Sequence, residues 1–249
     1  TSLILATNIK SQDARVFQSK LDNLSIKISE QTMFLSHWIK GLDVEGLKKL
    51  DDENAPRLFN SIPDLSYSLF HSREAAKHTL SEKEEQLIHK KDTNGIEVIS
   101  LLYDLIVNDF EFLLKIKETD QEGKETGEIK KISIDNQEKV VSYVRSTNPQ
   151  EREAAYKALF EPYKHNVDKL FMIYSAIAKD WKIESKMRDY DSSISMRNFC
   201  NQIPDQVISV LLEVCTKNIG LYQEYFKIKA GMLGVDKLKR YDVYAPVTN

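Results

Sequence analysis

The chain has 249 residues, of which 41% are hydrophobic and 29% charged, and its formal net charge is −3. This composition supports a sizeable core and a hydrated surface, and the net charge gives no sign of nucleic-acid binding, which needs a clustered basic face. Two cysteines are too few for a disulfide framework, and the sequence contains no apolar run of membrane-spanning length and no signal-peptide pattern. We therefore expect a cytoplasmic protein with neither a nucleic acid nor a membrane as partner.

Long amphipathic helices are predicted for most of the first 110 residues. Apolar residues recur at helical spacing from Ser11 to Lys40, and Gly41 is placed to end that helix. Ser81 and Glu84 form the pattern of a capping box at the start of a later helix, which Gly95 interrupts. The low numbers of glycine (eight) and proline (six) favour long helices over many short strands.

The hydrophobic pattern changes to strand spacing between residues 110 and 134. Phe110 to Lys117 and Glu128 to Ile134 contain period-two alternation, and a polar stretch with two glycines joins them. No other stretch carries a strand signal. We therefore predict an all-α fold, mainly long antiparallel helices, with one β-hairpin near residues 110–134.

Two long helices are expected in the second half of the chain. The first runs from Pro149 to Lys186, with Asn148 as its N-cap and a kink or break at Pro162. The second runs from Pro204 to Met232, a length of roughly 43 Å, and its apolar stripe should pack on the first. We divide the chain into a helical region with the hairpin (residues 1–134) and a long-helix region (residues 135–249); one continuous unit is the alternative.

The spacing of side chains in the second long helix predicts which of them are buried and which are exposed. Cys215 lies among apolar residues and is expected to be a small core residue. The aromatic group of Tyr222, Tyr225 and Phe226 is expected in the core as well. The charged residues of this helix should face solvent or substrate; they are Lys217, Glu224, Lys227 and Lys229.

The most metal-like pattern is formed by His71, Glu74 and His78. Positions i, i+3 and i+7 share one helix face. The outer two ligands would however lie about 10 Å apart along the axis, which suits a single zinc ion poorly. We favour a solvated face with partly packed imidazole rings, and a zinc site is the alternative.

Residues 187–247 combine several motifs in a fixed order. They are Arg188-x-Tyr190, a helix entry Asn-x-Ile-Pro at Asn201 to Pro204, the helix after it, and Leu-x-x-Tyr-Asp-x-Tyr-x-Pro at Leu238 to Pro246. Together these motifs resemble the oligoendopeptidase F family, which groups with the zinc peptidases related to thimet oligopeptidase. The resemblance extends more weakly back to about Leu80.

The resemblance implies that zinc-bound water hydrolyses short peptides in a channel between two largely helical halves. Members of the family carry the zinc motif His-Glu-x-x-His, and here no two histidines lie four residues apart. We therefore expect a non-catalytic N-terminal and middle fragment that forms one channel wall and is inactive alone. Zinc would belong to the full-length parent and not to this chain, whose partners would be the catalytic half and short peptides.

Five residues are candidates for substrate binding or for the channel wall: Arg188, Tyr190, Tyr241, Asp242 and Tyr244. Arg188 either contacts substrate or binds carbonyl groups at a helix end. Tyrosines can stabilise an oxyanion, but we favour a docking role for the Tyr241–Tyr244 segment. No catalytic or metal-binding residue is assigned. The alternative to the peptidase hypothesis is a stand-alone helical interaction module without enzymatic activity.

Overall fold

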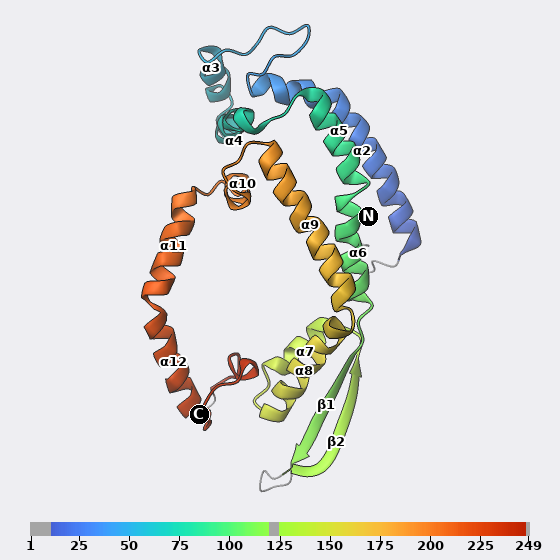
Figure 1. Cartoon of the computed structure of the whole chain (residues 1–249), viewed down its shortest axis with the longest axis vertical. Coiled ribbons are helices and arrows are strands. Elements are labelled where there is room, and N and C mark those ends of the chain that lie inside the picture. Colours follow the sequence, from blue (N-terminus) through green and yellow to red (C-terminus); the bar gives the residue numbers. More distant parts are fainter. Residues whose placement is uncertain (1–10, 120–124, 248–249) are drawn as a thin grey trace. The chain divides into compact units, whose positions relative to one another are not determined.

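The computed structural model describes residues 11–119 and 125–247. The first half of this part of the chain is helical up to a hairpin (Figure 1). Its elements are α2 (Gln12–Ile39), α3 (Asn54–Asn60), α4 (Pro63–Glu74), the 3₁₀ turn η1 (Ala75–His78), α5 (Glu82–Thr93), α6 (Ile96–Asn108), β1 (Phe112–Thr119) and β2 (Glu125–Ile134).

The second half of the described chain returns to helix. Its elements are α7 (Gln137–Val144), α8 (Pro149–His165), α9 (Val167–Met187), α10 (Ser193–Cys200), α11 (Asp205–Lys217), α12 (Ile219–Met232) and the 3₁₀ turn η2 (Arg240–Asp242). The predicted fold class, all-α with one β-hairpin, is confirmed. Within the described residues no helix is long and apolar enough to cross a membrane.

The chain forms two compact units, and each is made of two separate stretches. The first unit comprises the described part of Thr1–Asp104 together with Ile173–Gln202. The second comprises Leu105–Met172 and Ile203–Asn249, again in its described part. The boundary between residues 134 and 135 that the sequence suggested falls inside the second unit and stays a prediction.

The first unit has a small aromatic core where α3 and α4 meet the end of α2. Phe59 and Ala55 are fully buried, and Phe59 meets Phe70 edge to face at 5.2 Å between ring centroids. Burying such a ring contributes about 1.5–3 kcal/mol. The predicted capping box of Ser81 and Glu84 is present at the start of α5. Gly41 has a φ of +72° just after α2, which confirms the predicted helix stop.

The core of the second unit lies between the hairpin and α8. β1 pairs antiparallel with β2, and its buried residues Phe112, Leu114 and Ile116 alternate with exposed ones. The buried face packs against the alanines of α8, which are Ala154, Ala155 and Ala158. Small side chains let the helix approach the strand closely, so a two-stranded sheet gains the cover that it needs for stability. Asn148 caps α8 and Pro149 is its first residue, as predicted.

Both long helices expected from the sequence are split at an asparagine. The first divides at Asn166 into α8 and α9, one turn after Pro162, which α8 tolerates. The second divides at Asn218 into α11 and α12, so the single helix of roughly 43 Å is wrong. Each asparagine amide donates to the carbonyl four residues earlier, Pro162 in one case and Val214 in the other. Such side-chain bonds compete with the backbone ladder of a helix.

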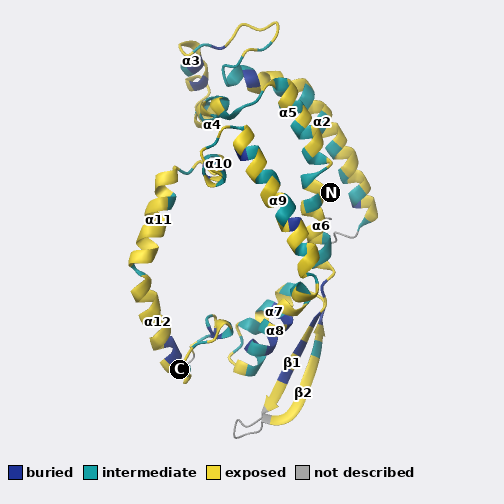
Figure 2. Ribbon diagram, viewed as in Figure 1, coloured by how far each residue is buried: buried dark blue, intermediate teal, exposed yellow. Residues whose placement is uncertain are grey.

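The apolar stripe of α11 and α12 is exposed, which corrects a second expectation (Figure 2). No residue of α11 is buried, so its stripe does not pack on α8. Cys215 and the aromatic group of α12 are exposed and not in a core. Conversely Lys229, expected to face solvent or substrate, is buried, and its ammonium donates to the carbonyl of Val243 at 2.8 Å.

Candidate functional site

Arg188, the first of the candidate residues, lies in an ion-pair network of the first unit. It follows the last residue of α9, and its guanidinium binds both carboxylate oxygens of Glu85 on α5, at 2.7 and 2.9 Å. Its Nε donates to Glu184 at 2.8 Å. Both Arg188 and Glu85 are only 16% exposed. A bidentate, half-buried pair of this kind fixes the end of α9 to the start of α5.

The network shifts the pKa values of its members. Burial alone would raise the pKa of Glu85, but the hydrogen bonds from Arg188 and from the Leu80 N–H outweigh it and lower that pKa. The same carboxylate raises the pKa of Arg188. Lys40 also faces this pair, and burial lowers the pKa of its ammonium although Glu85 opposes the shift.

A pH dependence of stability follows from the lowered pKa of Glu85. A carboxyl group whose folded-state pKa is depressed contributes stability above its unfolded pKa, near 4.5, and loses it as the pH falls through the folded value. We expect the free energy of unfolding to decline below that pH more steeply in the wild type than in Glu85→Gln. Urea denaturation at a series of pH values measures both slopes, and identical slopes would contradict the assignment.

Tyr190, the second candidate, is stacked in an aromatic cluster of the same unit. Its ring lies 3.6 Å from that of His78, centroid to centroid, with 16° between the planes. Phe199 of α10 adjoins both rings, at 5.9 Å from Tyr190 and 5.6 Å from His78. Burial raises the pKa of the Tyr190 phenol. The cluster attaches α10 to η1.

The metal-like pattern at His71, Glu74 and His78 does not converge on one point. His71 Nδ1 lies 3.7 Å from Glu74, whereas His78 Nδ1 is 2.7 Å from the carbonyl oxygen of Arg188. His78 also lies in the 3₁₀ turn after α4, so the three residues do not share one α-helix. Across the described residues, no group of three His, Cys, Asp or Glu side chains is arranged to hold a metal ion.

Asp242, in the second unit, anchors the segment after α12. It is 4% exposed and forms a buried ion pair at 2.9 Å with Arg152 of α8, which is 3% exposed. Its other oxygen accepts from the Lys239 N–H. Arg152 also donates to the carbonyls of Ser146 and Thr147. Sequence reasoning missed Arg152, although its position three residues before the buried Ala155 places it on the buried helix face.

The two tyrosines beside Asp242 differ in environment. Tyr241 is half-buried with its ring 5.9 Å from that of Tyr156, and burial together with the charges of Glu153 and Asp242 raises its pKa. Tyr244 is 55% exposed, and the Arg240 guanidinium lies 5.5 Å from its ring centroid. Arg188 and Tyr190 belong to the first unit and these residues to the second, so the candidates form two separate clusters.

Next to Asp242 the second unit contains an open groove of about 560 Å³, which we call the lysine groove. β1, the start of α8 and the segment of residues 234–242 form its walls. Its charged and aromatic lining consists of Lys115, Lys117, Glu153, Lys157, Asp236, Lys237, Lys239, Tyr241 and Asp242. The groove is large enough for a small ligand or a short stretch of peptide.

Comparison with protein families links both units to one group of peptidases. The model described as "Peptidase family M3" matches residues 142–249, and the model described as "Oligopeptidase F" matches residues 47–112. Together the two models cover more than half of the chain. The chain belongs to the oligoendopeptidase F family.

Relatives within the oligoendopeptidase F family match the chain over different lengths. The oligoendopeptidase F homolog of Borreliella burgdorferi is 23% identical over 248 residues, which is 99% of this chain and 38% of the relative. A homolog from Lactococcus lactis is 31% identical over 108 residues, or 43% of this chain and 18% of the relative. The chain thus spans about two fifths or less of these relatives.

Solved structures share the fold. The oligoendopeptidase F of Enterococcus faecium superposes with a TM-score of 0.74 at 24% identity, covering all of this chain and 46% of that one. A putative oligoendopeptidase F of Bacillus anthracis gives a TM-score of 0.63 at 16% identity, covering 97% of this chain and 39% of that one. At these identities the likeness establishes the fold alone.

Proposed function

We propose that this chain forms a non-catalytic wall of the substrate channel in an oligoendopeptidase F-like zinc metallopeptidase, which hydrolyses short peptides. The observation that carries the proposal is the family match over residues 47–112 and 142–249. The catalytic half of the parent protein would supply the zinc ion and the general base. Zinc supplies a polarised, activated water when bound in such an enzyme.

The residues of this chain do not fit a zinc site of their own. The sequence has no His-Glu-x-x-His motif, and His78 is hydrogen-bonded to the backbone carbonyl of Arg188 and stacked on Tyr190. Four of the five candidate residues make contacts within their own unit: Arg188 and Asp242 in ion pairs, and Tyr190 and Tyr241 in ring contacts. The fifth, Tyr244, is exposed and lies beside the guanidinium of Arg240. No hydrolytic step is therefore assigned to this chain, whose proposed part is to bound the channel and admit short peptides.

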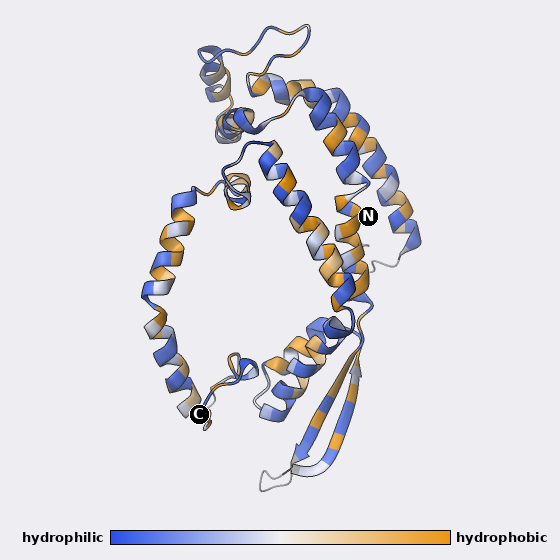
Figure 3. Cartoon of the chain, viewed as in Figure 1, coloured by the Kyte–Doolittle hydropathy of each residue, from blue (hydrophilic) through white to orange (hydrophobic). Residues whose placement is uncertain are grey.

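Exposed apolar residues on α11 and α12 support the proposal that the catalytic half of the parent protein docks on these helices. Leu211, Val214 and Leu221 of the apolar stripe are 55%, 50% and 65% exposed, and Figure 3 shows hydrophobic residues along both helices. Covering exposed apolar side chains is favourable by about 25 cal/mol per Å² of buried apolar area, and exposed apolar surface often marks an interaction site. The exposed stripe is consistent with an interface to the catalytic half.

Mixing experiments test this proposal. The chain is combined with the separately expressed remainder of its parent, and cleavage of a quenched fluorescent peptide is measured. We expect activity only in the mixture, and a loss of about tenfold or more when the chain carries Leu211→Asp together with Leu221→Asp, since a charged group cannot be buried cheaply at an apolar interface.

The matched control carries Leu87→Asp and Ile183→Asp, which replace leucine and isoleucine residues 60% and 59% exposed in the first unit. This variant should recover activity like the wild type. Full activity of the remainder alone would show that the wall is dispensable and would contradict the proposal. No activity in any mixture, with both parts folded, would favour the stand-alone interaction module.

A further inference from the structure

The exposed face of the hairpin carries a cluster of lysines. We call the outer hairpin face the side made by Leu113, Lys115 and Lys117 of β1 with Ser133, Lys131 and Ile129, their partners on β2. It lies opposite the buried residues that pack on α8, because successive side chains of a strand point to opposite faces. Three of its six side chains are lysines, and all three are exposed.

Lys115 and Lys131 lie directly opposite each other in the register. Cβ atoms of such a pair are about 5 Å apart, and like charges at that distance destabilise a sheet. Within the described residues neither ammonium has an ion-pair partner, whereas Lys139 is paired with Asp135 and Lys157 with Glu153. A repulsive pair on a two-stranded sheet is a conflict between local sequence and stability, and such conflicts concentrate at functional sites.

The same lysines continue into the lysine groove. Lys115 and Lys117 line it from β1, and Lys237 and Lys239 line it from the opposite segment. Two of the groove's three acidic residues are already neutralised, Asp242 by Arg152 and Glu153 by Lys157. Asp236 is the third. The first residues of α8, Pro149 and Gln150, add the positive end of a helix dipole. The groove therefore presents a positive field to a ligand.

We propose that the outer hairpin face and the lysine groove together bind an acidic segment of a peptide chain, with the lysines pairing to its carboxylates. The proposal deepens the proposed function and rests on it for the class of ligand, a peptide. A peptide fits better than a nucleic acid, since the chain as a whole is acidic and the lysines are interleaved with Asp236, Glu153 and Tyr241. Leu113 and Ile129, both exposed on the same face, give the ligand apolar neighbours beside the lysines.

Binding is measured with the full 249-residue chain and two fluorescein-labelled peptides, one with six consecutive glutamates and one with six glutamines, by fluorescence anisotropy. We expect the glutamate peptide to bind about tenfold more tightly, and the difference to shrink at high salt, since several exposed pairs of modest strength are screened together. Lys115→Glu combined with Lys131→Glu should remove this preference.

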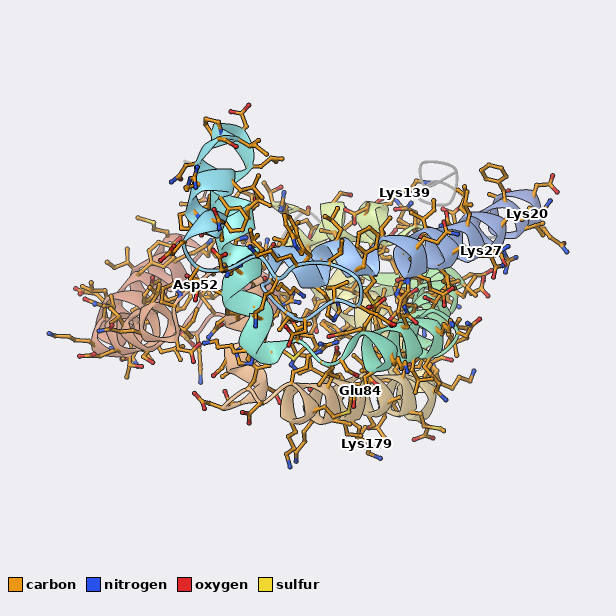
Figure 4. All side chains as sticks on the ribbon, turned by 90° about the horizontal axis from the view of Figure 1, so that it is seen from above. Lys20, Lys27, Asp52, Glu84, Lys139 and Lys179 are labelled. Carbon is orange, nitrogen blue, oxygen red and sulfur yellow. The ribbon has the colours of Figure 1, made fainter. Side chains whose placement is uncertain are left out.

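The control variant carries Lys20→Glu and Lys27→Glu, which change the net charge of the chain equally. Both lysines project from α2 into solvent (Figure 4) and belong to the first unit. This variant should keep the preference for glutamate. If it loses as much affinity as the hairpin variant, the binding follows net charge alone and the proposed site is wrong.

A single substitution separates binding from hairpin stability. Lys115→Glu replaces the repulsive pair by a cross-strand ion pair with Lys131, so it should raise the melting temperature of the chain. The same substitution should lower its affinity for the glutamate peptide by about tenfold or less. Unchanged affinity in this folded variant would overturn the proposal, and so would tighter binding of a single-stranded oligothymidylate than of the peptide. If the mixture of the two parts shows no peptidase activity while the chain still binds the glutamate peptide, the result would count against the channel-wall proposal and not against the binding site.

Discussion

Asp242→Ala is expected to lower the free energy of unfolding of the second unit by about 3–5 kcal/mol, because it leaves the guanidinium of Arg152 buried without its counter-charge. Arg152 is 3% exposed and Asp242 is 4% exposed, so solvent does not replace the lost partner. The substitution also removes the acceptor of the Lys239 N–H. Urea denaturation followed by far-ultraviolet circular dichroism gives the free energy, and hydrogen exchange of α8 locates the loss.

Two further variants make the test specific to the buried charge. Asp236→Ala removes an exposed carboxylate from the same segment and should change stability by about 0.5 kcal/mol or less. Arg152→Met combined with Asp242→Leu removes both charges and should be more stable than Asp242→Ala, since no uncompensated charge remains. Equal losses in the single and double variants would show that packing, and not the ion pair, holds this segment.

Arg188→Ala should lower the stability of the first unit by about 2–3 kcal/mol. The arginine makes two hydrogen bonds to Glu85 and one to Glu184, and charge-assisted bonds in a half-buried site contribute about 1.5–3 kcal/mol when solvent screening is allowed for. Both tryptophans, Trp38 and Trp181, belong to the first unit, so their fluorescence follows its unfolding in urea.

Lys179→Ala is the matched control for Arg188→Ala. Lys179 lies on the same helix, α9, and its side chain extends into solvent (Figure 4). It should leave the tryptophan transition nearly unchanged. If Arg188→Ala behaves like Lys179→Ala, the network is not a stabilising contact, and Arg188 becomes a stronger candidate for a direct role toward substrate.

The sequence predicted best the features that depend on residues close together in the chain. The capping box of Ser81 and Glu84, the cap and proline at Asn148 and Pro149, and the period-two pattern of β1 are local, and each is confirmed. The break at Asn218 was missed, and the kink or break of the first long helix was expected at Pro162 and not at Asn166, because asparagine is only slightly unfavourable inside a helix. In both cases the side-chain amide donates a hydrogen bond to a carbonyl of the preceding turn, which competes with the backbone bonds that would continue the helix.

The candidate site was predicted less well, since its contacts depend on residues far apart in the sequence. Arg188 and Glu85 are 103 positions apart, and Arg152 and Asp242 are 90 apart. Periodicity marks which face of a helix is apolar, but it does not state what covers that face. For this reason Cys215 and the aromatic residues of α12 were placed in a core that the structure does not form around them.

The division of each unit into two stretches has a consequence for biosynthesis. A ribosome adds about 5–20 residues per second, so Glu85 emerges roughly 5–20 s before Arg188. During this interval α2 and α5 exist without α9 and α10, which complete their unit. The nascent chain must therefore hold an incomplete first unit while the hairpin and α8 are made. Neither unit can therefore finish folding until its second stretch has been synthesised.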